Sequence, residues 1–463
     1  MLTTKIVVVG AGSASFGLNT LGAIMRSARL RGSHLALVDQ NTQTLGVIER
    51  LALRLNQEWD AQMRITTHAH HKDALPGADF VVSAIEVPPR EQLWRQDFQI
   101  PLKFGLRQPY AENGGPGGWA HAARNLGPVL QIAHDMETAC PDAWFINFTN
   151  PMMRICDAVA RYSTIKVVGL CHQIQAGYGM VGYCLAEELD IRVPPGEIAT
   201  HADPRFWPNL KKVAKQAMEK IDIKAAGLNH FTWMLDVRDK ASGADLYPLF
   251  RERWERLDPS FEPLTRKVFA DFGVFPIPGD EHLCEYLPWM SDAAARPWEK
   301  FDLSLYDWEA AEVRRGEGHA EIERMGRGIA PVTPLLEADS EGALEVIENL
   351  SRAGNHYHLA VNIPNEGYIL NLPQGAIVEV PAVFSGLGAR GMGVGALPVA
   401  VAELCRREIV VVQLGVDAVV QGDRQKALQS LLFSPGIIDL DQAEQILDAY
   451  LTEYRPYLPT FWE

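Results

Sequence analysis

Short apolar runs alternate with longer amphipathic stretches over the first 170 residues of the chain. The runs are rich in Val, Ile and Phe, as buried strands are, and lie at residues 6–9, 35–38, 80–85, 144–148 and 165–170. Between them, residues 44–55 and 129–138 have the apolar spacing of helices that bury one face. This alternation predicts a mostly parallel, doubly wound sheet with right-handed crossovers.

The pattern changes in the second half of the chain. Helical spacing dominates from residue 247 onward, with acidic exposed faces at residues 341–350 and 439–451, and strand-like runs gather at residues 354–383. We therefore expect an α/β fold of two large domains that meet at one ligand crevice. Residues 1–195 would form a Rossmann-type domain, and residues 196–463 an α+β domain that covers the crevice.

Composition narrows the classes of protein. The 463 residues include 43 basic and 58 acidic side chains, which gives a formal charge of −15, and 47% are hydrophobic. Such a chain has a large core and does not favour nonspecific nucleic-acid binding, which needs Lys and Arg to neutralise phosphates. No apolar stretch approaches the ~18 residues of a transmembrane helix, so we expect no membrane contact. Six cysteines without a CxxC pair favour a reduced, cytoplasmic location.

A glycine turn follows the first apolar run and precedes a helical segment, which is the context of a dinucleotide fingerprint. Ser15 stands where the third glycine is expected, and Gly17 comes two residues later. Asp39 ends the second run about 20 residues beyond the glycines, where an acid would bind the adenosine ribose and favour NAD over NADP. The alternative is that Asp39 caps the next helix. The residues expected at the cofactor are Gly10, Gly12, Ser13, Ala14, Ser15, Phe16 and Asp39.

Polar side chains follow the later apolar runs. Asn150 comes after the run at 144–148, Cys171 and His172 come after the next, and His230 closes a further strand-like stretch. Strand ends of a parallel sheet meet at one crevice, and a thiolate with an imidazole there could bind a divalent metal. Taken separately, each residue has an ordinary structural interpretation, as a core cysteine, a structural histidine or a turn asparagine.

An ordered set of motifs resembles glycoside hydrolase family 4. The motifs lie at residues 10–13, 95–105, 115–118, 149–151, 171–172, 227–230, 281–289, 371–373 and 378–381. The resemblance implies a Rossmann-type doubly wound sheet followed by an α+β domain of the lactate/malate-dehydrogenase-like type. It also implies a homodimer or homotetramer.

The activity implied by this resemblance is an exo-glycosidase, of α preference, that needs NAD⁺ and a divalent metal such as Mn²⁺. Members oxidise C3 of the sugar, remove the C2 proton, eliminate the C1 substituent, add water and return the hydride, unlike glycosidases that use two carboxylates. The expected substrate is an unphosphorylated hexoside, a hexuronide or a sulfosugar glycoside. The alternatives are an NAD-dependent 2-hydroxy-acid or sugar dehydrogenase with net hydride transfer, or a non-catalytic NAD-binding regulator.

The resemblance also assigns residues. It implies that Cys171 and His230 are the metal ligands and that Tyr286 is the base, unless Tyr286 belongs to an aromatic packing segment. His172 would assist the leaving group or lie near the metal. The expected sugar contacts are Arg95, Glu112, Asn113, Asn150 and His172.

Two of these assignments have alternatives. Arg95 could instead form a structural ion pair with Asp97 or Glu91. His201 could compete with His230 as the ligand; it lies in residues 194–220, a lysine-rich insertion that we interpret mainly as a solvated helix face.

Overall fold

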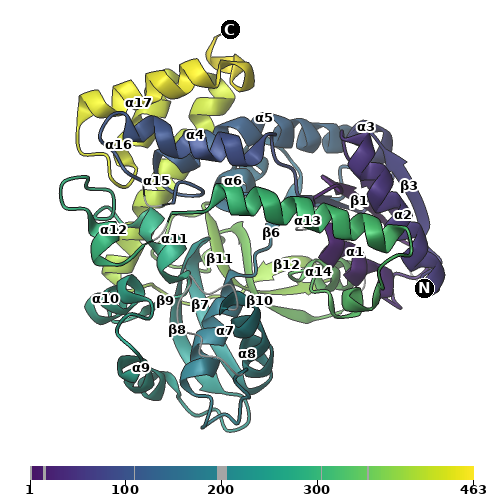
Figure 1. Cartoon of the computed structure of the whole chain (residues 1–463), viewed down its shortest axis with the longest axis horizontal. Helices are drawn as coiled ribbons and strands as arrows, with labels where there is room; N and C mark the ends of the chain where they lie inside the picture. Colours follow the sequence, from purple (N-terminus) through teal and green to yellow (C-terminus); the bar gives the residue numbers. More distant parts are fainter. Residues whose placement is uncertain are drawn as a thin grey trace.

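The computed structural model describes residues 3–13, 17–108, 110–194, 206–303, 305–351 and 354–462. Within these ranges one twelve-stranded sheet runs through the molecule in the order β3-β2-β1-β4-β5-β6-β10-β11-β7-β8-β9, with β12 against β11 (Figure 1). The N-terminal strands are β1 Lys5–Val9, β2 His34–Val38, β3 Arg64–His68, β4 Phe80–Ser83, β5 Trp144–Asn147 and β6 Lys166–Gly169. The others are β7 Ile221–Leu228, β8 Phe231–Asp239, β9 Phe275–Pro276, β10 His356–Pro364, β11 Ile377–Ser385 and β12 Gly388–Gly391.

The first six strands are parallel and have the 3-2-1-4-5-6 order of dinucleotide-binding domains. Their helices are α1 Gly17–Arg26, α2 Thr42–Glu58, α3 His71–Ala74, α4 Arg90–Leu102, α5 Gly115–Ala139 and α6 Met152–Tyr162. Strand order proceeds in opposite directions from β1, so right-handed crossovers place α1 and α2 on one face and α5 and α6 on the other. The predicted Rossmann-type sheet is confirmed, and its strand order reverses between β1 and β4, which is where sheets of this kind bind their ligands.

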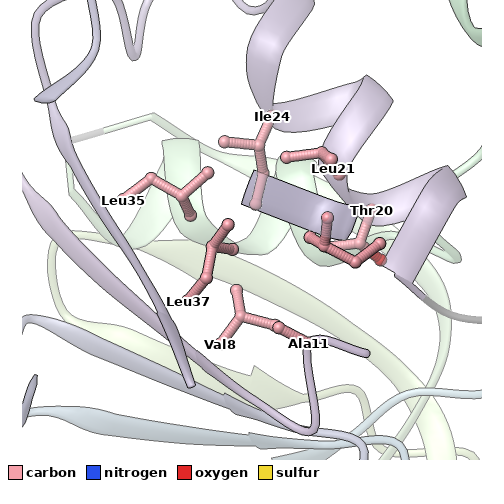
Figure 2. A pocket seen from close by; sticks show the side chains of 8 residues that line it. Val8, Ala11, Thr20, Leu21, Ile24, Leu35 and Leu37 are labelled. Carbon is pink, nitrogen blue, oxygen red and sulfur yellow. The ribbon is translucent and has the colours of Figure 1, made fainter. Parts of the chain in front are cut away.

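Helix α1 packs on the sheet through an apolar interface that leaves a small cavity (Figure 2). Side chains from α1, β1 and β2 line it, among them Leu21, Ile24, Val8 and Leu35. Because this lining is almost entirely apolar, the cavity belongs to the core rather than to a ligand site.

The later strands are antiparallel and extend the same sheet. β10 joins β6 through the pair Asn362 and Gly169, and β11 joins β7 through Glu379 and Gly227. The remaining helices are α7 Gln173–Cys184, α8 Phe206–Lys220, α9 Tyr247–Arg256, α10 Pro263–Phe272, α11 Gly279–Tyr286, α12 Pro297–Lys300, α13 Trp308–Gly326, α14 Ala343–Leu350, α15 Val399–Gln421, α16 Arg424–Phe433 and α17 Leu440–Glu453. Among the helices described here, none combines the length and apolar character needed to cross a bilayer.

The predicted division at residues 195 and 196 falls within 195–205, outside the described residues, and stays a prediction. Several C-terminal helices pack back on the N-terminal half: α15 contacts α5 and α6, and α17 contacts α4. α13 lies along α4 and reaches α2 (Figure 1). The chain therefore forms two unlike halves around one sheet.

The lysine-rich insertion contains α8, which packs against α7. Its inner face is buried at Leu210, Val213 and Ala217, while Lys211 and Lys212 are exposed. This part of the insertion is the solvated helix face that the sequence indicates. His201 lies outside the described residues.

Candidate active site

Cys171 and His230 meet although 59 positions separate them in the sequence. Cys171 follows β6, His230 lies in the turn between β7 and β8, and Cys171 Sγ is 3.2 Å from His230 Nε2. Burial, assisted by His282 and His172, holds the pKa of His230 well below its ordinary value, so its imidazole is neutral, the form that binds metals. Burial also raises the pKa of the Cys171 thiol, which would need a nearby cation to ionise.

The donor set fits a divalent transition metal. In the part of the chain that the structure describes, no three His, Cys, Asp or Glu side chains converge as a metal site. Cys171 and His230 would therefore supply two ligands, and the others would be oxygen atoms of the substrate or of an amide. Sulfur and imidazole nitrogen suit a first-row transition metal better than Mg²⁺ or Ca²⁺.

Two residues of α11 that were not among the predicted site residues, His282 and Glu285, pack against the pair of Cys171 and His230 on the side of His230. The His282 ring stacks on His230 with centroids 4.5 Å apart, and His282 Nδ1 lies 3.3 Å from Glu285 Oε2. Glu285 Oε1 accepts the backbone N–H groups of Glu112 at 2.7 Å and Asn113 at 2.9 Å. Burial alone would lower the pKa of His282, but the bond to Glu285 and the carboxylate of Glu112 raise it to about 9.

The Tyr286 hydroxyl contacts the backbone of His230. Its ring is buried and stacks on Phe231, with centroids 5.1 Å apart. The Tyr286 hydroxyl accepts the N–H of His230 at 3.1 Å and donates to the carbonyl of Asn229 at 3.5 Å. Burial and the charges of nearby carboxylates raise the pKa of Tyr286 well above its ordinary value. The phenol is thus beside the proposed metal ligand, and its role as the base stays a prediction.

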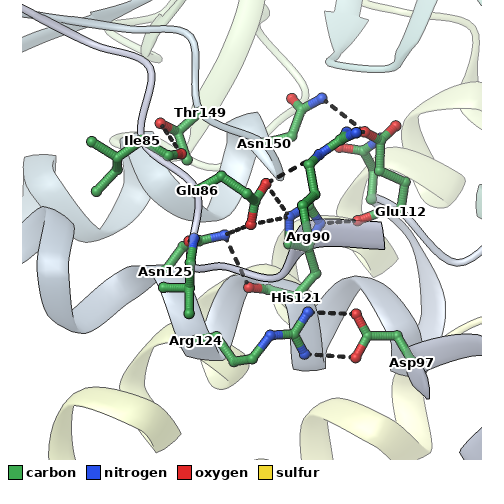
Figure 3. A network of polar contacts seen from close by, with 12 residues as sticks. Ile85, Glu86, Arg90, Asp97, Glu112, His121, Arg124, Asn125, Thr149 and Asn150 are labelled. Atoms are coloured by element: carbon green, nitrogen blue, oxygen red, sulfur yellow. Dashed lines mark hydrogen bonds and ion pairs between the residues drawn. The ribbon is translucent and has the colours of Figure 1, made fainter. Parts of the chain in front are cut away.

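A second polar group surrounds Arg90, at the start of α4 (Figure 3). Arg90 Nη2 lies 3.1 Å from Glu112 Oε1, which also accepts Asn150 Nδ2 at 3.5 Å. Glu86, after β4, lies 3.5 Å from Arg90 Nε and 3.0 Å from His121 Nε2. Burial opposes the ionised form of Glu86, but His121 and Arg90 lower its pKa to about 2. The structure therefore brings Glu112 and Asn150 together, and adds Arg90, Glu86 and His121 to them.

The glycine-rich segment that runs from the loop before α5 into its first turn packs against protein rather than leaving open backbone. A Cβ at Gly114 would lie 2.5 Å from the carbonyl oxygen of Glu285, and one at Gly118 would lie 2.1 Å from that of Asn113. Asn113 is buried and donates to Glu112 Oε2 at 3.0 Å, while Asn113 Oδ1 has no partner within the protein. The loop thus presents Glu112 and Asn113 in fixed positions.

Arg95 and His172 have other partners. Arg95 Nη2 pairs with Glu309 at 2.6 Å, not with either acid weighed in the sequence, so the geometry gives no support to its expected sugar contact. Arg95 follows Arg90 by five positions, about 140° around a helix, so the two point to different sides of α4. His172 is half-exposed, and its Nδ1 lies 2.9 Å from Glu341 Oε1.

The glycine turn fits a dinucleotide. Gly10 has φ +84°, and a Cβ there would meet the Ala84 carbonyl at 2.5 Å, so only glycine is accommodated. Gly12 N donates to Asp39 Oδ2 at 2.8 Å, which holds the acid at the turn. Asp39 is not the cap of α2, because Asn41 caps that helix. Ser13 lies in the described turn, whereas the expected contacts Ala14, Ser15 and Phe16 lie outside the described residues.

Comparison with known proteins identifies the family of this chain. A family model described as family 4 glycosyl hydrolase matches residues 5–186, and a model of the C-terminal domain of that family matches residues 225–437. The chain belongs to glycosyl hydrolase family 4. It is 30% identical to an α-glucosidase of Erwinia rhapontici over 99% of both chains.

Solved structures share the fold of this chain. A Bacillus subtilis structure described as the glucosidase lplD has a TM-score of 0.82 and 26% identity, and the match covers 97% of this chain and 100% of that one. A 6-phospho-α-glucosidase from gut microorganisms, in complex with NAD and Mn²⁺, has a TM-score of 0.79 and 22% identity, with 99% of each chain covered. The predicted fold class and glycosidase activity are confirmed, and the dehydrogenase and regulator alternatives are set aside.

Proposed function

We propose that this family 4 glycosidase uses NAD⁺ and a divalent metal such as Mn²⁺ to cleave a terminal α-linked, unphosphorylated and uncharged hexoside. The approach of Cys171 to His230 is the observation that supports this most strongly, because it pairs a thiol with a neutral imidazole at the strand ends. Bound there, NAD would accept the C3 hydride and return it, and the metal would acidify the C2 proton and the Tyr286 phenol.

The other roles in binding and proton transfer fall to individual side chains. Cys171 and His230 hold the metal, and Gly10, Gly12 and Asp39 hold the nucleotide. Asn150, Asn113 and Glu112 bind sugar hydroxyls; Glu112 is oriented for this by Arg90. Tyr286 takes the C2 proton on its phenol oxygen, and His172, oriented by Glu341, gives a proton to the leaving oxygen.

The charges around Arg90 favour a neutral sugar. Glu112 and Glu86 already neutralise Arg90, so a phosphate, carboxylate or sulfate on the sugar would have to displace one of them. Carboxylates accept hydrogen bonds from sugar hydroxyls and repel anions. The α-glucosidase relative acts, by its name, on a substrate of this kind. Hexuronides and sulfosugars are therefore the less favoured classes.

Assembly and location are part of the same proposal. We propose a homodimer or homotetramer, since large apolar side chains such as Leu370, Leu387 and Val399 are exposed by more than 70%. All six cysteines are free, and a cysteine ligand needs reducing conditions, which supports a cytoplasmic location. Light scattering of the purified protein tests the assembly directly.

The deciding experiment measures release of nitrophenol from α-glucoside, α-galactoside and α-galacturonide, together with exchange of the C2 hydrogen for solvent deuterium. We expect a neutral α-hexoside to be cleaved only with NAD⁺ and Mn²⁺, and Cys171→Ser to abolish both cleavage and Mn²⁺ binding. Tyr286→Phe should stop C2 exchange while Mn²⁺ still binds, because the phenol is not a ligand. Cleavage that survives removal of NAD⁺ or metal would contradict the proposal.

Loss of Mn²⁺ binding in Tyr286→Phe would instead assign the hydroxyl to holding the backbone of His230. Cleavage of the galacturonide alone would overturn the choice of a neutral sugar without affecting the assignment of the metal ligands.

A further inference from the structure

One buried carboxylate within the sheet has no cation beside it. Glu379 is on β11, between β10 and β7, and only 1% of the residue is exposed. Buried acids elsewhere, such as Asp97 and Asp157, have an arginine partner. In the described part of the chain no Lys, Arg or His pairs with Glu379, and only neutral side chains oppose the rise that burial causes in its pKa. A buried anion without a counter-charge is costly, so a cation bound nearby would stabilise it.

Three side-chain donors meet on Glu379. Its Oε1 accepts the Thr232 hydroxyl at 2.7 Å, and its Oε2 accepts Asn229 Nδ2 at 2.7 Å and Asn362 Nδ2 at 3.1 Å. Thr232 is on β8, Asn362 is on β10, and Asn229 lies in the turn between β7 and β8. Asn362 also reaches the carbonyl of Gly169, at the end of β6, at 3.4 Å. Because a carboxylate only accepts hydrogen bonds, Glu379 fixes which end of each amide faces it.

Both proposed metal ligands adjoin this network. Asn229 directly precedes His230, and its side chain also hydrogen-bonds to Cys171. Gly169 precedes Cys171 by two positions. The charge of Glu379 itself acts on Cys171. An amide nitrogen carries two N–H groups, so an Asn229 nitrogen that is turned toward Glu379 still has one to donate to the Cys171 sulfur.

We propose that Glu379 is a positioning residue of the metal site, which orients Asn229 against the Cys171 sulfur and supplies negative charge beside the bound cation. This rests on the proposed function, which supplies the metal. Glu379 is not itself a ligand in this proposal, since both of its oxygen atoms already accept donors from the protein. Partners that orient metal ligands typically change metal affinity by about 10–100-fold when they are replaced.

Binding of Mn²⁺ to the full-length protein, measured by calorimetry without substrate, tests this role. Glu379→Gln keeps the shape of the side chain, but removes its charge and turns an N–H donor toward other donors. We expect the Kd for Mn²⁺ to rise by about 30-fold. Asp157→Asn is the matched control, because Asp157 is an equally buried acid whose arginine partner is on the same helix. It should lose stability and keep the wild-type Kd, whereas a purely structural Glu379 would behave in the same way.

Co²⁺ provides a spectroscopic readout of the ligand itself. The charge-transfer absorption of a thiolate bound to Co²⁺ reports on the Cys171 sulfur, and it should weaken or shift in Glu379→Gln but not in Asp157→Asn. Thr232→Val is a milder variant that removes one donor to the carboxylate and keeps the shape, and its Kd for Mn²⁺ should rise by about threefold.

Two results would count against different parts of the argument. A wild-type Kd for Mn²⁺ in Glu379→Gln, or in Thr232→Val if Glu379→Gln does not fold, would overturn the role of Glu379 and leave the proposed function intact. A wild-type protein that binds no Mn²⁺ would overturn the proposed function and this inference with it.

Discussion

Two arginine–carboxylate groups lie close together between α4 and α5 and differ in almost every respect (Figure 3). In the first, Arg124 donates from both terminal nitrogens to Asp97 at 2.6 Å, and both side chains are buried. The Tyr454 hydroxyl donates to the same carboxylate at 2.7 Å and ties the end of α17 to α4. In this pair one cation faces one anion, and the two side chains satisfy each other's charge.

The second group is open. Arg90 keeps 27% of its side chain exposed and faces three carboxylates, Glu112 at 3.1 Å, Glu86 at 3.5 Å and Glu91 at 3.7 Å. Asn150 contacts Glu112 through a longer hydrogen bond of 3.5 Å. These longer contacts leave acceptors available to a ligand, whereas a closed bidentate pair offers none. The same pair of residue types therefore holds the fold together at one position and prepares a binding site at the other.

The largest effect is expected from breaking the closed pair. Arg124→Met would leave the carboxylate of Asp97 buried without a cation, which costs about 3–5 kcal/mol of folding free energy. Urea unfolding followed by circular dichroism measures this loss. Arg95→Met is the matched control, because its partner Glu309 is exposed and such pairs contribute less than about 1 kcal/mol. Equal losses in the two variants would contradict the assigned difference.

The open group should respond in kinetics rather than in stability. Arg90→Met frees Glu112 from its orienting cation, so we expect kcat/KM for the α-hexoside to fall by about 30-fold, or about 2 kcal/mol. The free energy of unfolding should change by less than in Arg124→Met, because Arg90 is partly solvated. Steady-state kinetics of Arg90→Met and Arg95→Met at saturating NAD⁺ and Mn²⁺ make the comparison. A larger fall in kcat/KM for Arg95→Met than for Arg90→Met would instead assign the sugar contact to Arg95.

Arg90 and Arg95 also show where sequence reasoning ends. The strands, the glycine turn and the place of Cys171 could be anticipated, because parallel strands end at one edge and place the following residues together. His230 lies between the antiparallel strands β7 and β8, so its pairing with Cys171 was implied by the family resemblance and not by strand order. Which of two arginines on one helix faces that edge depends on how the helix is rotated in the packed fold. The sequence motif includes Arg95, and the packing turns Arg90 inward.

The places of His282 and Glu285 beside His230 could not be predicted from the sequence, for a related reason. They lie on α11, more than 50 residues after His230, and only tertiary packing stacks the His282 ring on that ligand. The spacing of His282, Glu285 and Tyr286 on one helix was available as a signal, since residues three and four apart share a face. The role of the glycine-rich loop was hidden as well, because its close approach is to Glu285 and not to a ligand.

The smallest of the three effects concerns protonation of the open group. His121 and Arg90 lower the pKa of Glu86 to about 2, so this carboxylate stabilises the fold above its ordinary pKa of 4.5, and the stabilisation is lost as the pH falls toward 2. Burial opposes the cationic form of His121, but Glu86 raises its pKa overall. That contribution is complete below pH 6.5 and is lost as the pH rises through the raised value.

Urea unfolding at several pH values between 5 and 9 isolates the His121 contribution. The free energy of unfolding should decline above pH 6.5 in the wild-type protein, and His121→Gln should remove that part of the decline. We expect the change to be modest, because 23% of the Glu86 side chain is exposed and water partly replaces the lost charge. An identical pH profile in the variant would mean that His121 is neutral in the fold, and that the open group is held by Arg90 alone.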